Sequence, residues 1–293
     1  MEVIRAEQLT KYYGKTKGID GLNLTVHKSE FFGFIGPNGA GKSTTIRTLL
    51  GLITPTGGTA QVFGMDILRR KEDILRRVGY LPSEAVFYPG MRVGEVLRLS
   101  ANLRKKDCTV QAKHLCERLQ LDPARKVDEL SLGNRKKAAI VCALQHIPDL
   151  LILDEPTGGL DPLMQREFFS ILRERNAAGA TIFLSSHVLS EIQRNCDRAA
   201  IIRDGSVIAC GSVEELSKTA AKRVSVQGSI SLDRLSDIRD KTQQDGTVSF
   251  LYSGDINRLL QVLAEGQVFD LTLSEPDLEE VFLHYYEKEG KES

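Results

Sequence analysis

The sequence lacks a surplus of either charge. Its 293 residues contain 39 Lys and Arg against 39 Asp and Glu, so the formal net charge is zero. A protein that binds the phosphate backbone of nucleic acid concentrates positive charge, and the composition supplies no overall field of that kind. We therefore expect no nucleic acid among its partners.

Long apolar runs are also missing. A helix that crosses a bilayer needs about 20 consecutive apolar residues, whereas the most apolar stretches, 138–144 and 150–153, are short or flanked by charge. The amino-terminal residues MEVIRAEQLTKYYGK contain no apolar core of a signal peptide. We therefore expect a cytoplasmic protein for which any role at a membrane depends on a partner.

Cysteines are few, and their spacing shows no pairs. The five cysteines are odd in number and form no CxxC motif. Regular pairs would indicate a disulfide framework or a zinc site. We expect reduced thiols that pack in apolar or helical surroundings. They are Cys108, Cys116, Cys142, Cys196 and Cys210.

The sequence does contain a glycine-rich stretch between a strand and a helix. The run GPNGAGKST at 36–44 follows the apolar segment 31–35 and precedes the helical pattern 45–50. Glycines let backbone N–H groups point at phosphate oxygens, and the helix start adds its own unpaired N–H groups. In such a loop Lys42 reaches the β- and γ-phosphates, and the Ser43 hydroxyl holds Mg²⁺. The predicted nucleotide contacts are Gly36, Pro37, Asn38, Gly39, Ala40, Gly41, Lys42, Ser43 and Thr44.

Polar side chains end two of the predicted buried strands. The segment LLILDE ends in Asp154 and Glu155, and TIFLSSH ends in His187. Ligands of open α/β folds bind at the carboxyl ends of strands, so we predict that Asp154 holds Mg²⁺ and that Glu155 orients or deprotonates water. An acidic strand end can instead cap a helix, and a lone histidine is more often structural. The phosphate loop favours the catalytic interpretation.

The patterns divide the chain into two units. Alternating stretches in 2–30 predict antiparallel strands, and helical spacing from 93 to about 146 predicts a helical insertion. A composition shift near 216–223 then ends the first unit. We expect a domain at 1–217, with a helical subdomain at about 85–147, and a small α+β domain at 218–293 with a regulatory or docking role. The strands predicted in that second domain are 223–227, 248–252 and 268–273, and its helices are 232–241, 256–264 and 277–286.

Together these motifs resemble those of the ATP-binding cassette (ABC) ATPase family over about residues 2–216. GPNGAGKST is similar to the family's first phosphate motif, LLILDEPTGGLDP to its second motif and dimer-contact loop, and SSH to its switch histidine. The resemblance implies an α/β fold with a P-loop NTPase (RecA-like) core, an antiparallel β subdomain, a helical subdomain and the small C-terminal α+β domain. It also implies that Tyr13, in KYYG, stacks on adenine, where the residues alone favour packing on the sheet.

Two positions depart from the family pattern. The family's LSGGQ stands here as LSLGN at 130–134, which keeps Ser131 and Gly133, the groups that contact the γ-phosphate held by the opposite subunit. The glutamine that reaches Mg²⁺ after Leu81 and Pro82 is replaced by Ser83, which can still bind metal through water. The segment 271–282 resembles the accessory tail of drug- and antibiotic-type exporters.

The resemblance implies an ATP-binding and ATP-hydrolysing subunit of a multi-subunit ABC transporter, an exporter rather than an importer. Lys42, Glu155 and His187 would act in the hydrolysis of ATP bound with Mg²⁺. Two copies of the chain would close over two ATP molecules, and separate integral membrane permease subunits would hold them on the inner face of the cell membrane.

The sequence alone leaves two other functions open. One is a soluble ABC-type ATPase that acts on DNA or ribosomes. Such proteins typically carry a long coiled coil or a second cassette, and the sequence shows neither a sustained heptad run nor a second GxxxxGK[ST] motif. The other is a non-hydrolysing regulatory nucleotide binder, which conflicts with the intact pair Asp154 and Glu155.

Overall fold

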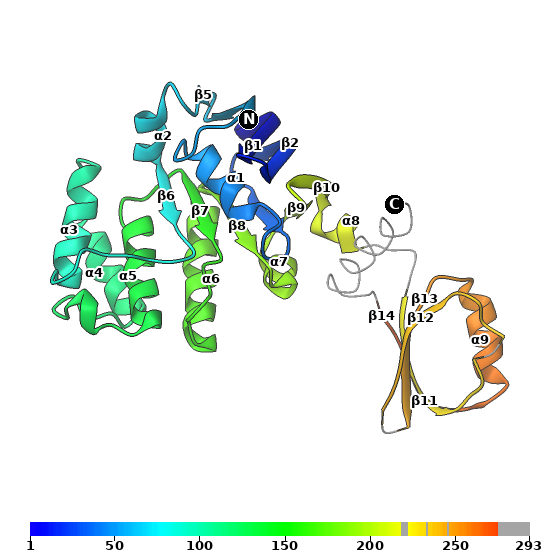
Figure 1. Ribbon diagram of the computed structural model, residues 1–293. Coiled ribbons are helices and arrows are strands. Elements are labelled where there is room, and N and C mark those ends of the chain that lie inside the picture. Colours follow the sequence, from blue (N-terminus) through cyan, green and yellow to red (C-terminus); the bar gives the residue numbers. More distant parts are fainter. Residues whose placement is uncertain (218–221, 233, 245, 275–293) are drawn as a thin grey trace. The chain divides into compact units, whose positions relative to one another are not determined.

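The computed structural model describes residues 1–217, 222–232, 234–244 and 246–274 (Figure 1). Within them the chain forms two compact units, Met1–Gly211 and a second that starts at Ser212. The short helix α8 (Val213–Ser217) belongs to the second unit, whereas the sequence analysis predicted a domain boundary after residue 217. Each unit has its own sheets and its own core.

A six-stranded sheet forms the centre of the first unit, in the order β10-β9-β3-β8-β7-β6. Its pairs β3–β8, β3–β9, β7–β8 and β6–β7 are all parallel. Every residue of β3, β7 and β8 is buried, as expected for parallel strands covered on both faces. The carboxyl ends of these strands therefore share one edge, which is the edge predicted to hold the site. The strands are β3 (Phe31–Ile35), β6 (Val78–Leu81), β7 (Leu150–Asp154), β8 (Thr181–Ser186), β9 (Arg198–Arg203) and β10 (Ser206–Ser212).

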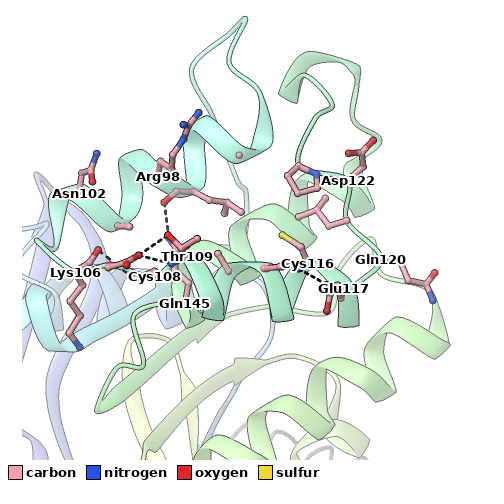
Figure 2. Close-up of a pocket in the computed structure, with 18 of the residues that line it drawn as sticks. Arg98, Asn102, Lys106, Cys108, Thr109, Cys116, Glu117, Gln120, Asp122 and Gln145 are labelled. Carbon is pink, nitrogen blue, oxygen red and sulfur yellow. Dashed lines mark hydrogen bonds and ion pairs between the residues drawn. The ribbon is translucent and has the colours of Figure 1, made fainter.

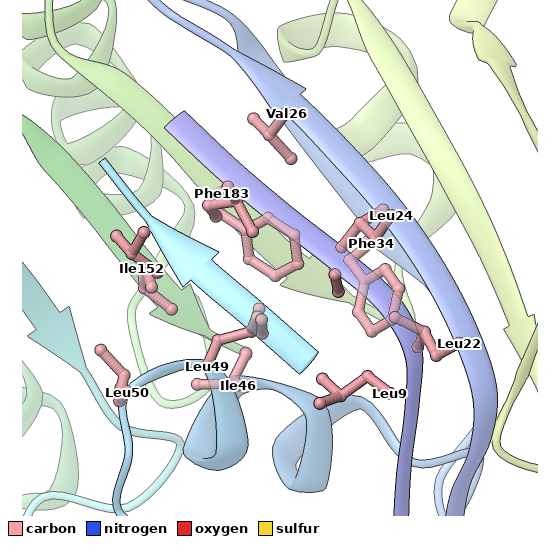
Figure 3. Close-up of a cluster of buried hydrophobic side chains, with 14 of the residues drawn as sticks. Leu9, Leu22, Leu24, Val26, Phe34, Ile46, Leu49, Leu50, Ile152 and Phe183 are labelled. Carbon is pink, nitrogen blue, oxygen red and sulfur yellow. The ribbon is translucent and has the colours of Figure 1, made fainter. Parts of the chain in front are cut away.

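An antiparallel sheet in the order β2-β1-β4-β5 packs against this centre. Its first two strands pair antiparallel, which confirms the expected antiparallel subdomain. Apolar side chains of this sheet, of α1 and of the central sheet form one core (Figure 3). That core fixes where α1, and hence the phosphate loop, stands. The elements are β1 (Glu2–Tyr13), β2 (Thr16–His27), β4 (Gly57–Val62), β5 (Met65–Asp66) and α1 (Lys42–Leu49).

The predicted helical insertion is confirmed as a group of helices at one end of the first unit (Figure 1). Arg118, at the end of α4, joins this group to α6 through ion pairs of 2.5 Å with both Glu167 and Glu174. No helix in the described part of the chain is both long and apolar enough to span a bilayer. The helices of the insertion are α3 (Val93–Leu103), α4 (Thr109–Arg118), the 3₁₀ turn η1 (Val127–Glu129) and α5 (Leu132–Leu144). The first unit also contains α2 (Lys71–Arg77), α6 (Pro162–Ala177) and α7 (Leu189–Asn195).

A cavity of about 1260 Å³ lies in the helical group, lined mainly by α3 and α4 (Figure 2). Gln145 is one of the lining residues, and its Nε2 donates to the Leu97 carbonyl at 3.0 Å. The lining contains no residue of the phosphate loop and none of the acids after β7. This cavity is therefore separate from the predicted nucleotide site.

The second unit is a sheet in the order β12-β13-β11-β14, packed on α9. Its strands β11, β13 and β14 and its helix α9 confirm the expected α+β pattern. The helix predicted at 232–241 is wrong, because Ile238 pairs with Tyr252 in a strand, and tertiary pairing overrides helical spacing. The helix predicted at 277–286 lies outside the described residues. The elements are β11 (Lys222–Ser229), β12 (Ile238–Gln244), β13 (Thr247–Tyr252), α9 (Ile256–Ala264) and β14 (Gln267–Ser274).

The cysteines follow the expected pattern with one exception. All are free thiols, and Cys108, Cys116 and Cys196 are buried, with Cys142 partly buried. Cys210 is exposed on β10, so the expectation of a packing role is wrong for this residue.

Candidate active site

The phosphate loop, residues 36–41, takes a shape that only glycine allows at two positions. Gly41 precedes α1 with φ 107°, and a Cβ there would lie 2.5 Å from the carbonyl oxygen of Gly18. A Cβ on Gly36 would lie 2.6 Å from the carbonyl oxygen of Ile202. Close approach of β2 and β9 therefore forces glycine at both positions, and the backbone N–H groups at the start of α1 stay free of intruding side chains.

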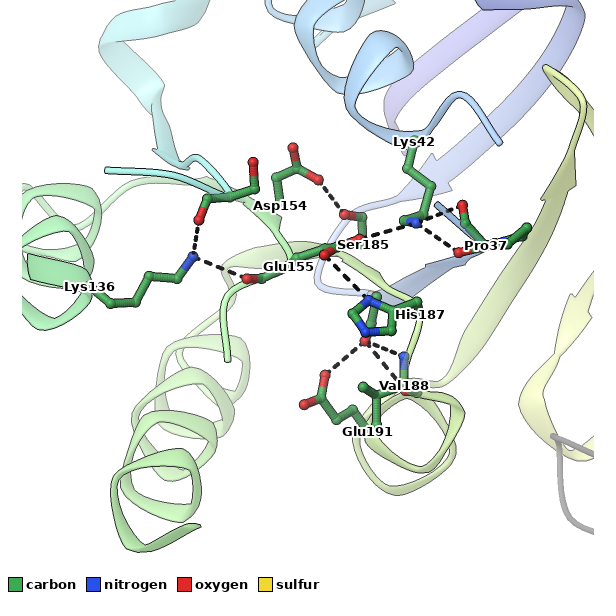
Figure 4. A network of polar contacts seen from close by, with 12 residues as sticks. Pro37, Lys42, Lys136, Asp154, Glu155, Ser185, His187, Val188 and Glu191 are labelled. Atoms are coloured by element: carbon green, nitrogen blue, oxygen red, sulfur yellow. Dashed lines mark hydrogen bonds and ion pairs between the residues drawn. The ribbon is translucent and has the colours of Figure 1, made fainter. Parts of the chain in front are cut away.

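Lys42 joins this loop to the acids after β7 (Figure 4). Its side chain is 5% exposed, and Nζ donates to the carbonyl oxygens of Gly36 at 2.7 Å and Pro37 at 3.1 Å. The same Nζ lies 3.2 Å from Oε1 of Glu155. The predicted convergence of the phosphate loop and the acids on one edge of the sheet is therefore present in the structure.

Glu155 also contacts the histidine predicted at this edge. Its Oε2 lies 3.3 Å from Nδ1 of His187, whose side chain is 51% exposed. Partial burial acts to raise the pKa of Glu155, but the hydrogen bond and the charge of Lys42, assisted by His187, outweigh it and bring that pKa below its ordinary value. A carboxylate that is ionised at neutral pH can only accept hydrogen bonds, as a group that orients or deprotonates water must.

Asp154 is fully buried at the end of β7. Its Oδ1 accepts a hydrogen bond of 2.7 Å from Ser185 Oγ, which stands beside it on β8. Its Oδ2 is buried and has no hydrogen-bond partner among the residues that the structure describes. A buried carboxylate oxygen without a donor is costly, and a hard cation with oxygen ligands would satisfy it. The residue therefore fits the role of a Mg²⁺ ligand.

The Ser185–Asp154 hydrogen bond gives a testable prediction. A buried hydrogen bond to a charged group contributes about 1.5–3 kcal/mol, so Ser185→Ala should lower the free energy of unfolding of the first unit by about that amount. Thr109→Ala is the matched control, since it removes a hydroxyl–carboxylate bond of equal length, 2.7 Å, to the exposed Asp107. Urea unfolding of both variants checks this, and equal effects would show that burial adds nothing.

Tyr13 lies beside the phosphate loop. A Cβ built on Gly18 would lie 3.1 Å from Cε2 of the Tyr13 ring and 3.0 Å from the Thr44 methyl carbon, so the ring and the first turn of α1, which follows the loop, flank the same point. The side chain is 46% exposed, and Lys11 Nζ lies 5.3 Å from the ring centre. An aromatic ring that is half exposed beside a phosphate loop is available to stack on a base.

Ser131 and Gly133 lie at the start of α5. Ser131 is exposed and caps the helix by accepting from the N–H of Asn134 at 3.4 Å. Gly133 packs on the loop after β7, where an added Cβ would lie 2.6 Å from the carbonyl oxygen of Gly159. Within the described contacts neither residue touches the phosphate loop of its own chain. The neighbouring Leu132 is 71% exposed, so the start of α5 lies at the surface of the first unit.

The sequence did not single out two residues that the structure brings to the site. Ser185 is the parallel-register neighbour of Asp154, which the order Ser-Ser-His alone does not reveal. Lys136 is buried on α5, and its Nζ donates to the carbonyl oxygens of Pro82, Ser83 and Glu155. Its spacing from Ile140 and Ala143 on the buried side of that helix was the available signal.

The fold and this constellation define a P-loop nucleoside triphosphatase. A family profile described as ABC transporter matches residues 19–158. The chain is 37% identical over 298 residues to the bacitracin transport ATP-binding protein BcrA of Bacillus licheniformis, covering 96% of both chains. It is 36% identical over 296 residues to the Nod factor export ATP-binding protein I of Cupriavidus pinatubonensis, covering 96% of this chain and 90% of the relative.

A solved structure agrees with these relatives. The structure of an ATP-binding subunit of an ABC transporter matches with a TM-score of 0.69 and 31% identity, over 73% of this chain and 91% of that one. The chain belongs to the ABC transporter ATP-binding protein family. It is the ATP-binding, ATP-hydrolysing subunit of a transporter, which confirms the expected function over both alternatives.

Proposed function

We propose that this chain is one half of a dimeric motor that hydrolyses ATP with Mg²⁺ and drives separate permease subunits. The observation that carries the proposal is the meeting of Lys42, Glu155 and His187, with 3.2 Å from Nζ to Oε1 and 3.3 Å from Nδ1 to Oε2. Phosphoryl transfer to water needs little covalent chemistry from the protein. A cation, a base and a polar side chain at one edge of the sheet therefore suffice to position the phosphate and the water.

Each residue then has a role in that site. Lys42 exchanges its loop carbonyls for phosphate oxygens, the loop amides surround the phosphates, and Tyr13 stacks on adenine. Glu155 accepts a hydrogen bond from the attacking water, and His187 braces the γ-phosphate. These roles are consistent with the half-exposed ring of Tyr13 and with the ionised state of Glu155.

The cation site uses oxygen ligands from three elements. Ser43 at the start of α1 and Asp154 at the end of β7 would hold Mg²⁺ directly, and Ser83 after β6 would hold it through water. The bound ion would neutralise charge that develops on the phosphate oxygens. The unpartnered Oδ2 of Asp154 supports this assignment.

A second copy of the chain completes the site. Ser131 is exposed at the N-cap of α5, and Gly133 in the first turn packs on the loop after β7. Among the described contacts neither residue touches the phosphate loop of its own chain. In the dimer each pair would meet the γ-phosphate bound by the partner. ATP would then bind the closed dimer better than the open chain, so binding closes the pair and hydrolysis releases it.

Export is the direction that the relatives support. One relative is named for bacitracin transport and another for Nod factor export, and both are matched over almost the whole chain. We place the chain in the cytoplasm, peripheral to the inner face of the cell membrane through integral membrane permease subunits. The balance of charges supports no role for nucleic acid.

Fractionation of cells tests the transport assignment. The chain is expressed alone and together with the membrane protein that copurifies with it from its native source. We expect it to sediment with membranes only in the second case. Sedimentation with membranes in the absence of the membrane protein, or no sedimentation in its presence, would contradict the proposed attachment through permease subunits.

A further inference from the structure

Lys136 is a buried cation whose hydrogen bonds, within the described part of the chain, all go to main-chain carbonyl oxygens. It lies on α5 with 3% of its surface exposed. Its Nζ donates to the carbonyl oxygens of Ser83 at 2.8 Å, Glu155 at 3.0 Å and Pro82 at 3.2 Å. An ammonium has three N–H donors, so this one is fully used. Burial lowers the pKa of Lys136, while the charges of Asp154 and Glu155 oppose that shift.

One of these carbonyls belongs to a residue in an unfavourable backbone conformation. Glu155 has φ 47°, in the left-handed region that costs a non-glycine residue about 1–3 kcal/mol. Its N–H donates to the carbonyl oxygen of Ser185 at 3.1 Å, and its own carbonyl oxygen accepts from Lys136. The backbone of Glu155 is therefore held from β8 on one side and from α5 on the other. That turn directs its carboxylate to Lys42 and His187 (Figure 4).

The remaining two carbonyls belong to the loop after β6, which leads into the helical group and carries Ser83. The helix that carries Lys136 has Ser131 as its N-cap and Gly133 in its first turn. One ammonium thus connects the start of α5, the loop after β6 and the backbone of Glu155. A displacement of α5 cannot leave all three contacts unchanged, because the Lys136 side chain is fixed on that helix.

We propose that Lys136 is a positioning residue for hydrolysis. Its ammonium holds the backbone turn that orients the Glu155 carboxylate. The orientation of that carboxylate therefore depends on the position of α5. The inference rests on the proposed role of Glu155 in hydrolysis. It assigns Lys136 no contact with nucleotide. Its removal therefore affects turnover and leaves nucleotide binding by Lys42 and the phosphate loop in place.

Kinetics of the full-length protein test this. Lys136→Met keeps an unbranched side chain, one atom shorter than that of lysine, and removes all its donors. A displacement of about 1 Å at a reacting group can cost about 100-fold in rate, so we expect kcat to fall about 10- to 100-fold while the Kd for ATP stays within about 3-fold. The control is Lys113→Met, since Lys113 is 79% exposed, and its kcat should match that of the wild type.

Three outcomes would overturn the proposal. One is a kcat of Lys136→Met within about 2-fold of the wild type. Another is a parallel fall of kcat, ATP affinity and Tm, which would mark a general structural role. The third outcome concerns Lys136→Gln, which keeps two donors and serves if Lys136→Met does not fold. We expect its kcat to fall about 3- to 10-fold, and a wild-type kcat would contradict the proposal.

A double-mutant cycle separates this inference from the proposed function. In single-turnover assays, adding Lys136→Met to Glu155→Gln should change the residual rate by less than about 2-fold, because Lys136 acts through that carboxylate. A further loss as large as that in the wild-type background would show that Lys136 acts independently of Glu155. Wild-type turnover by Glu155→Gln alone would instead remove the assigned role of Glu155, whatever Lys136→Met does.

Discussion

Glu155→Gln should bind ATP, hydrolyse it about 10²–10⁴-fold more slowly than the wild type and accumulate as a dimer. The rate loss follows because the amide cannot accept the proton of the attacking water, and general-base catalysis contributes a factor of that size. Binding persists because Lys42 and the phosphate loop are unchanged. Phosphate release measures the rate, and sedimentation velocity with ATP and Mg²⁺ measures the dimer.

A matched substitution guards against an indirect effect. Glu117→Gln changes the same side chain at a position on α4 that is 64% exposed, and it should leave both the rate and the dimer fraction at wild-type values. The Glu155→Gln dimer should also require ATP, since the proposed interface contains the nucleotide. A variant that hydrolyses ATP at the wild-type rate would remove Glu155 from the role of base.

The part of the site that sequence could predict is the part that lies in continuous motifs. The glycines around Lys42 and the acids that end β7 each belong to a local strand-and-turn pattern, and parallel topology brings strand ends to one edge. The contact of 3.2 Å between Lys42 and Glu155 follows from these two facts.

Residues that act through tertiary contacts escaped prediction. Lys136 is one lysine among neighbouring basic residues, and only the packing of α5 on the loop after β6 reveals that it is buried. For Tyr13 the residues alone favoured packing on the sheet, and only the family resemblance predicted a nucleotide contact, because its closeness to Thr44 depends on the approach of β2 at Gly18. In the second unit, helical spacing at 232–241 gave way to strand pairing of Ile238 with Tyr252. Periodicity reports which residues are apolar and not which partner covers them.

Lys42→Met should have the opposite signature to Glu155→Gln, losing the nucleotide rather than trapping it. A hydrogen bond to a charged group contributes about 1.5–3 kcal/mol, so we expect ATP to bind about 10- to 100-fold more weakly. Turnover at saturating ATP should fall about 10²–10³-fold, the usual cost of removing one donor that stabilises developing charge. Fluorescence titration with a labelled ATP analogue and phosphate release measure the two effects. The exposed Lys28→Met should change neither.

The stability of the nucleotide-free chain should differ between Lys42→Met and the double variant Lys42→Met/Glu155→Gln. Lys42→Met leaves the carbonyl oxygens of Gly36 and Pro37 without their donor and removes the charge that lowers the pKa of Glu155. Lys42 is buried and Glu155 is 29% exposed, so removing Lys42 alone leaves a partly buried carboxylate without its main counterion, and removing both charges should cost less. The double variant Lys42→Met/Glu155→Gln should therefore unfold at a higher urea concentration than Lys42→Met alone. An equal or lower midpoint would mean that the contact between Nζ and Oε1 is too solvated to stabilise the empty site.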